Sequence, residues 1–212
     1  MYSPSGGTCE INTAFLKRHR FDLDMVSGEN MSNELREFPL FKSLWLRVKD
    51  PDKVALIIVN DDGSDERLTY SGIFENTNKI SRLLIKAGVR EGDTFAVIMR
   101  NHPEFLYSLS AALSIGAVMV PMDPRSRGAK LVFQISNTKC RGIIISDEFI
   151  SRIKEIEKEI RDIPVIGVVY KKHHDIPVEP AYPVLNEVLV RESGSPPDKI
   201  KPMKLSRPVQ II

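Results

Sequence analysis

The chain has 212 residues, 42% of them hydrophobic, and can therefore bury the core of one large α/β domain or two small ones. Its 30 Lys and Arg residues are interspersed with 28 Asp and Glu residues, and the net charge of +2 gives no electrostatic footprint for nucleic acid. Two distant cysteines indicate a reducing compartment, and no apolar run approaches the roughly 18–20 residues that cross a bilayer, so we expect a cytoplasmic protein without a membrane span.

The N-terminal region differs in pattern from the rest of the chain. Residues 1–31 have no sustained apolar period, which predicts a flexible tail or, alternatively, a natural start at Met31. We expect residues 32–212 to form the ordered unit. Its first predicted helix begins at Pro39, carries apolar residues at helical spacing from Phe41 to Val48, and ends at Asp50-Pro51.

Strands and helices alternate through the remainder of the chain. Two β-rich runs, Val54 to Val59 and Glu66 to Tyr70, are joined by polar residues containing Asp62-Gly63, which predicts a hairpin. Further strands are expected at 94–99, 117–121, 142–146, 165–170 and 208–212. Helices are expected after Thr69, from Pro103, around Leu131, over 149–160 and over 185–190. Strands that are apolar throughout are buried on both faces, so the sequence predicts an α/β, three-layer αβα fold with a mainly parallel sheet and an N-terminal β-hairpin.

Polar residues follow two of these strands, at the carboxyl ends where parallel α/β sheets bind ligands. Arg100, Asn101 and His102 follow the strand at 94–99, and Asp123 follows the next strand. Asn101, His102 and Asp123 are therefore the candidate substrate-binding residues. The alternative is structural, and it is the more common one: Asn101 or His102 caps the next helix, and Asp123-Pro124 forms a turn.

The adjacent pair His173-His174 raises the question of a metal site. Neighbouring side chains of an extended segment point to opposite sides, and no carboxylate or thiol lies at helical spacing from the pair. We therefore expect a surface loop here and no metal site. The sequence also lacks the G-x-x-x-x-G-K-[ST], G-x-G-x-x-G, G-x-S-x-G and H-E-x-x-H patterns, and no catalytic residue is identified.

Four stretches carry a family resemblance: "LTY" opening a helix, "AGVREGD" before a strand, "NHPEF" opening the next helix and "GAVMVPMDP" ending the following strand. Together they resemble the N-terminal subdomain of the adenylate-forming (AMP-binding) enzymes, with the acyl-CoA synthetases closest, from about Phe38 to Ile212. Gly72 departs from the pattern, because an acidic residue is more common there. In such enzymes a strand like "PVQII" runs into a Ser/Thr/Gly-rich loop of the form T-S-G-T-T-G-x-P-K, which suits binding of the ATP phosphates.

The resemblance implies a truncated acyl-CoA synthetase-like ligase whose residues 32–212 end just before that phosphate-binding loop. A complete member would join a carboxylic acid to ATP, form acyl-AMP with Mg²⁺ at the phosphates, and pass the acyl group to CoA. The family's catalytic elements all follow this segment. We therefore expect no catalytic residue, no cofactor and no activity in this chain alone.

The same resemblance implies partners. Apolar side chains and a strand edge near 208–212 are expected to be exposed, so the chain would bind the missing C-terminal portion of the ligase or associate with itself. Two alternatives remain open: a stand-alone binding or interaction module, and one half of a split ligase. A third is an unrelated doubly wound nucleotide-binding protein, and the lack of a Gly-rich first βα turn counts against it.

Overall fold

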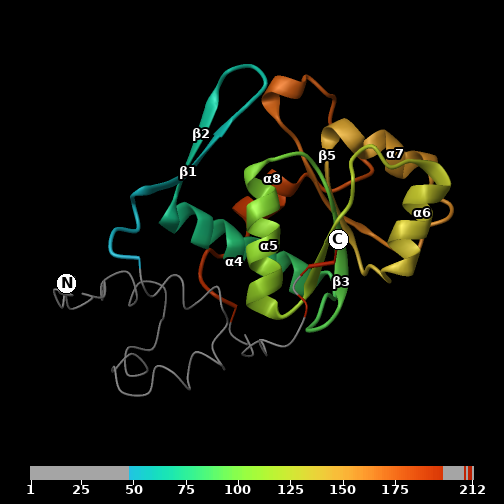
Figure 1. Cartoon of the computed structure of the whole chain (residues 1–212), viewed down its shortest axis with the longest axis horizontal. Coiled ribbons are helices and arrows are strands. Elements are labelled where there is room, and N and C mark those ends of the chain that lie inside the picture. The colour runs from blue at the N-terminus through green and yellow to red at the C-terminus, as the bar shows by residue number, and fades with distance from the viewer. Residues whose placement is uncertain (1–47, 198–207, 209, 212) are drawn as a thin grey trace, which may run out of the picture.

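The computed structural model describes residues 48–197, 208, 210 and 211. The tail expected over 1–31 and nearly all of the helix expected from Pro39 lie outside the described residues. The described part begins with a β-hairpin and continues as alternating strands and helices (Figure 1).

The two hairpin strands are β1 (Val54–Val59) and β2 (Asp65–Thr69), and they pair antiparallel, as the sequence predicts. The Asp62 carboxylate closes the turn by accepting a hydrogen bond from the Ser64 amide at 2.9 Å. Gly63 takes the left-handed conformation with φ 80°, which glycine adopts without steric cost. The Asp62-Gly63 signal in the sequence therefore predicted the hairpin correctly.

Helix α4 (Tyr70–Lys86) follows the hairpin directly. Thr69 caps it, because its Oγ1 accepts a hydrogen bond from the Gly72 amide at 3.1 Å. The first turn carries no acidic residue. A Cβ atom at position 72 would lie 3.2 Å from Thr69 Oγ1, so the glycine suits this tight cap.

The main sheet has four parallel strands in the order β4-β3-β5-β6. They are β3 (Thr94–Ile98), β4 (Val118–Pro121), β5 (Ile143–Ser146) and β6 (Val165–Val169). The register pairs Thr94 with Val118 and Ala96 with Ile143. The predicted parallel sheet is confirmed, and its order places the carboxyl ends of β3, β5 and β6 next to one another.

Part of the strand expected at 208–212 is described, and it adds to the outer side of β4. Gln210 forms a parallel bridge with Met119, and the Ile211 amide donates to the Met119 carbonyl at 3.2 Å. The side chain of Ile211 is exposed, as expected for this end of the chain.

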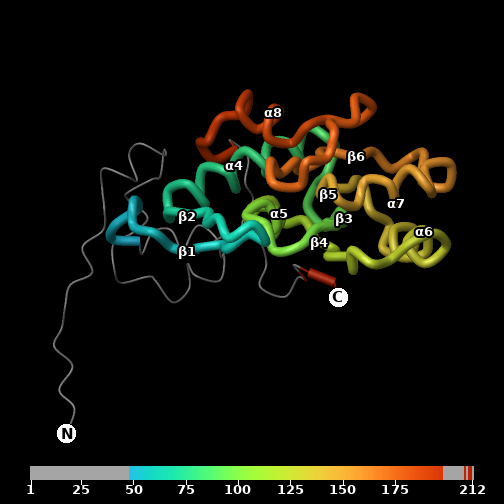
Figure 2. The backbone as a smooth tube through the Cα atoms, turned by 90° about the horizontal axis from the view of Figure 1, so that it is seen from above, coloured from blue at the N-terminus to red at the C-terminus, as the bar shows by residue number. Residues whose placement is uncertain are grey.

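Helices cover both faces of the sheet (Figures 1 and 2). They are α5 (Pro103–Ile115), α6 (Gly128–Asn137), α7 (Ile150–Glu155) and α8 (Leu185–Val190), together with α4. In Figure 1, α4, α5 and α8 lie to one side of the sheet, and α6 and α7 lie to the other. No helix in the described ranges is long and apolar enough to cross a membrane.

The strand residues alternate between the two apolar layers, as the pleat of a strand requires. Phe95 and Val97 pack in the layer of α4, α5 and α8, whereas Ala96 and Ile98 pack in the layer of α6 and α7. All four are essentially inaccessible to solvent. The predicted three-layer αβα fold is therefore confirmed.

The helix expected over 149–160 is shorter than predicted. Phe149 belongs to a 3₁₀ turn and α7 ends at Glu155, after which Ile156 leaves the helical conformation at φ −119°. Ile156 and Ile160 nevertheless stay buried in the core, on successive turns. The apolar spacing predicted which side chains are buried but not the backbone that buries them, because turns can satisfy the same spacing.

Candidate functional site

Polar side chains from the carboxyl ends of three neighbouring strands meet at one edge of the sheet. β3 leads to His102, β5 leads to Asp147 and Glu148, and β6 leads to Lys171 and His174. The three loops approach one another because β3, β5 and β6 are adjacent and parallel. We call these five residues the polar cluster. This edge of a parallel sheet is where α/β proteins bind their ligands.

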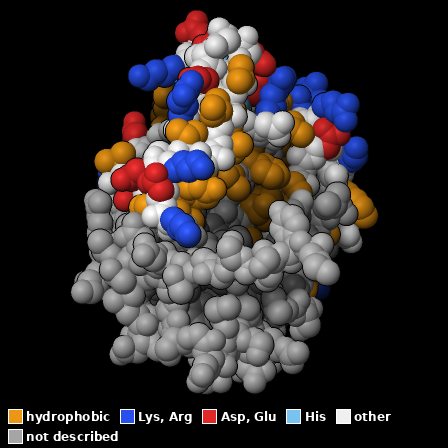
Figure 3. Space-filling view, turned by 60° about the vertical axis from the view of Figure 1, so that its left-hand side comes forward, with side chains coloured by type: hydrophobic (Ala, Val, Ile, Leu, Met, Phe, Trp, Pro, Cys, Tyr) orange, Lys and Arg blue, Asp and Glu red, His pale blue; other side chains and the backbone are white. Residues whose placement is uncertain are grey.

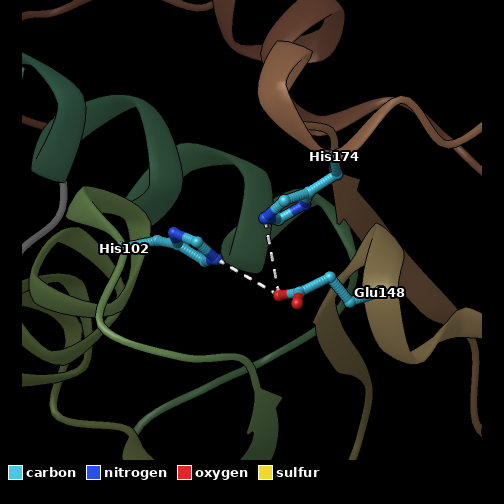
Figure 4. A group of neighbouring side chains, drawn as sticks. All are labelled: His102, Glu148 and His174. Carbon is cyan, nitrogen blue, oxygen red and sulfur yellow. Dashed lines mark ion pairs between the residues drawn. The ribbon is translucent and has the colours of Figure 1, made fainter. Parts of the chain in front are cut away.

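Two imidazoles and one carboxylate of the polar cluster converge (Figure 4). His102 Nε2 lies 3.8 Å from Glu148 Oε2, and His174 Nε2 lies 3.6 Å from a carboxylate oxygen of the same residue, also Oε2. One ligand atom from each of the three residues lies within 4.8 Å of the other two. We call His102, Glu148 and His174 the His–Glu–His group.

Two atoms of this group are buried without a hydrogen-bond partner. They are His102 Nε2 and Glu148 Oε2. The His102 side chain is only 7% exposed, so bulk solvent has little access to it. Buried polar atoms are nearly always paired in proteins, and an exception often marks a site for a ligand or ion.

Asp147 fixes the orientation of His174. Its carboxylate is fully buried and lies 2.6 Å from His174 Nδ1. It also accepts hydrogen bonds from the backbone amides of Glu148 and Lys171, at 2.8 and 3.1 Å. A carboxylate held in this way accepts a hydrogen bond from Nδ1–H, and in that tautomer the lone pair lies on Nε2, the atom that faces Glu148.

Lys171 joins the polar cluster to the hairpin and to α5. Its Nζ lies 3.1 Å from Glu66 Oε1 on β2 and 3.1 Å from Glu104 Oε2 in the first turn of α5. The side chains of Lys171 and Glu104 are each 9% exposed. Charges buried this deeply are stable only when they are paired, so Lys171 and Glu104 depend on each other.

Burial lowers the pKa of His102 below its usual range, and electrostatic interactions with Lys171 and His174 act in the same direction. The carboxylates of Glu148 and Glu66 oppose the shift without cancelling it. The environment therefore favours a neutral His102 imidazole.

This lowered pKa predicts a loss of stability in acid. Above an unfolded-state pKa of about 6.5, His102 is neutral in both states and contributes nothing to the pH dependence. As the pH falls below that value, the unfolded state takes up the proton first, so the free energy of unfolding decreases. We expect His102→Gln to show a smaller decrease between pH 7 and pH 5 than the parent, measured by urea unfolding. Equal decreases in both proteins would contradict the assignment.

The structure brings one of the three candidate residues, His102, into the polar cluster. His102 occupies the N-cap position of α5, but its side chain makes no capping hydrogen bond. Asn101 is exposed in the connecting loop. Asp123 accepts a hydrogen bond from the Arg125 amide at 2.9 Å and pairs with the Arg125 guanidinium, and these contacts lower the pKa of its carboxyl group. The turn interpretation therefore describes Asp123, and a binding role for the three residues stays a prediction.

Sequence reasoning placed His174 on a surface loop, and this expectation is wrong. Its side chain is only 10% exposed and contacts Asp147 and Glu148. The error came from assuming an extended segment, whereas Lys172–His174 form a 3₁₀ turn. Asp147, Glu148 and Lys171 were not singled out either. All three follow the carboxyl ends of β5 or β6, where parallel α/β sheets bind ligands, so their positions in the sequence were a usable signal.

Comparison with known proteins gives a consistent family. The model of the AMP-binding enzyme family matches residues 46–207. A crotonobetaine/carnitine–CoA ligase of Salmonella paratyphi B is 27% identical over 139 residues, which make up 65% of this chain and 25% of that ligase. The chain thus spans about a quarter of the length of the curated relatives it matches.

Solved structures agree on the fold. An acyl-CoA synthetase of Brucella canis superposes with a TM-score of 0.62 at 16% identity, covering 74% of this chain and 27% of that one. Apo MatB from Rhodopseudomonas palustris superposes with a TM-score of 0.60 at 18% identity, and the match covers 79% of this chain and 30% of the MatB chain. At these identities the likeness establishes the fold alone.

Proposed function

The chain belongs to the AMP-binding enzyme family, and from this premise we propose that it supplies the N-terminal part of an acid–thiol ligase of the acyl-CoA synthetase type. The observation that carries the proposal is the family match over residues 46–207. The resemblance to CoA ligases in sequence and to acyl-CoA synthetases in fold supports the same branch of the family.

The proposed parent reaction has two steps. A carboxylate attacks the α-phosphorus of ATP and releases pyrophosphate, which leaves an acyl-AMP. The thiol of CoA then attacks the acyl carbon and releases AMP. Transfer of this kind needs positioned donors, cations and Mg²⁺ around the phosphates.

The residues of this chain do not fit the phosphate groups of ATP. The 212-residue sequence has no Ser/Thr/Gly-rich phosphate loop and no P-loop, so we propose that another part of the ligase binds the phosphate groups. We propose that residues 32–212 are the scaffold unit and that the chain alone is inactive. A cytoplasmic location is part of the proposal, since Cys140 is a buried free thiol.

An apolar surface on the hairpin supports a partner for this scaffold. Val54, Leu56, Ile57 and Val59 of β1 are exposed by 40, 40, 47 and 71%. Figure 3 shows hydrophobic side chains gathered on the face of the molecule that carries the hairpin. Exposed apolar patches commonly mark contact surfaces, so we propose that this one binds the remainder of the ligase or a second copy.

Two measurements test the proposal. The DNA downstream of the Ile212 codon is expected to encode the Ser/Thr/Gly-rich loop, in the same or another frame. Unrelated sequence there would favour the stand-alone module. Sedimentation of the isolated chain is expected to show self-association that Ile57→Lys reduces, with Lys158→Glu at an exposed position after α7 as a surface control. A monomer at high concentration would argue against the apolar contact.

A further inference from the structure

We propose that the His–Glu–His group is a binding site for a divalent zinc ion, with His102 Nε2, Glu148 Oε2 and His174 Nε2 as its three protein ligands. The inference does not depend on the proposed ligase activity. It starts from the two buried atoms, His102 Nε2 and Glu148 Oε2, that have no hydrogen-bond partner.

The donor atoms have the chemistry that zinc prefers. Two imidazole nitrogens and one carboxylate oxygen form a common three-ligand set for Zn²⁺, with a water molecule completing the coordination. Mg²⁺ and Ca²⁺ favour oxygen ligands alone, so two histidines disfavour them. The His–Glu–His group is therefore selective by ligand type.

The surrounding residues hold the ligands as metal sites usually do. Histidine ligands commonly donate their second ring N–H to a carboxylate, which fixes the tautomer and directs the other nitrogen at the metal. Asp147 does this for His174, with a 2.6 Å contact to Nδ1 and two backbone amides holding the carboxylate. Glu148 is held through its other oxygen, because Arg100 Nε lies 3.4 Å from Oε1.

The separations require a small closure of the group. Tetrahedral zinc with bonds of about 2.0–2.1 Å places its ligands about 3.3–3.4 Å apart. Glu148 Oε2 lies 3.8 Å from His102 Nε2 and 3.6 Å from His174 Nε2. Small side-chain rotations that move the Glu148 carboxylate by a few tenths of an ångström bring it into this range. The ligand nitrogens of the two imidazoles lie within 4.8 Å of each other and must approach further.

The described residues around the site include several carboxylates. Four buried or half-buried carboxylates, those of Glu66, Glu104, Asp147 and Glu148, lie around the site. Lys171 pairs with Glu66 and Glu104, and Arg100 pairs with Glu148 and also with Asp61. A divalent ion would balance the remaining negative charge.

Zinc titration of the full chain tests the site, with heat measured by calorimetry after removal of metal with chelator. We expect binding of one Zn²⁺ per chain, together with a higher melting temperature. Glu148→Gln keeps the shape of the side chain and removes its charge, so it is expected to weaken binding at least about tenfold, and His174→Gln similarly. Asp147→Asn should weaken it by about 10–100-fold, as loss of a residue that orients a ligand does.

His173→Phe is the matched control, because it removes the imidazole nitrogens and keeps an aromatic ring where the His173 ring packs against His174, with centroids 4.5 Å apart. It should bind zinc like the parent. Because Cys9 and His19 are further potential ligands in the sequence, a Cys9→Ser/His19→Gln variant is measured as well and should also bind normally. Circular dichroism without metal verifies that each variant is folded. Absence of one-to-one binding by the parent, or an equal loss in His173→Phe or Cys9→Ser/His19→Gln, would overturn the site.

Discussion

The 212-residue chain alone is expected to catalyse no acid-dependent exchange of labelled pyrophosphate into ATP. The sequence has no Ser/Thr/Gly-rich loop of the kind that suits binding of the ATP phosphates. Removing a single preorganised donor from an active site already lowers the rate by roughly 10²–10³. The loss of an entire phosphate-binding apparatus should therefore bring the rate to background.

The assay should include short, long and aromatic carboxylic acids, because the acid of the proposed reaction is not specified by these residues. Binding of ATP by itself is not informative, since nonspecific contacts can hold a nucleotide weakly. Exchange by the pure chain, abolished by Asn101→Ala or Asp123→Ala, would contradict the proposal. It would also place the chemistry at residues that the structure leaves outside the polar cluster.

Lys171→Met is expected to lower the free energy of unfolding by about 3–5 kcal/mol, the typical cost of removing one partner of a buried ion pair. Lys171 Nζ lies 3.1 Å from Glu104 Oε2, and both side chains are 9% exposed. Methionine fills a similar volume, so the main change is a carboxylate left without its counter-charge. Urea unfolding of the parent and the variant gives the difference.

Two further variants distinguish this cause from a general packing defect. Lys172→Met changes the adjacent lysine, which is exposed, and should leave the stability within about 0.5 kcal/mol of the parent. Adding Glu104→Gln to Lys171→Met removes the unpaired charge and should recover part of the lost stability. If the double variant loses more unfolding free energy than the two single variants lose together, the buried-pair interpretation is refuted.

The sequence predicted the layered core well because buried strands have an apolar composition that can be recognised in it. The strands from Thr94 to Val169 are short and apolar throughout, and only a sheet covered on both faces buries such segments. The helix starts were also readable, since Thr69 caps α4 and Pro103 opens α5. Helix length was less predictable, because Ile156 and Ile160 are buried from turns rather than from a helix.

The candidate site was only partly predictable. His102 was predicted as a candidate because it comes directly after a buried strand. Its partners in the polar cluster come after other strands. Asp147 and His174 are 27 residues apart in the sequence, and their contact arises from the parallel pairing of β5 with β6. Local spacing carries no information about such a contact. Strand order supplies it, and strand order is a property of the folded chain.

The most direct test of the account combines this chain with a polypeptide from the same genome that carries the phosphate-binding loop and the C-terminal lid. The measurement is acid-dependent exchange of pyrophosphate into ATP by each polypeptide alone and by the two together. The account predicts background exchange for each alone and exchange well above background for the pair, with an acid-dependent rate. A stable complex of the two that gives no exchange with any acid of the panel would contradict it.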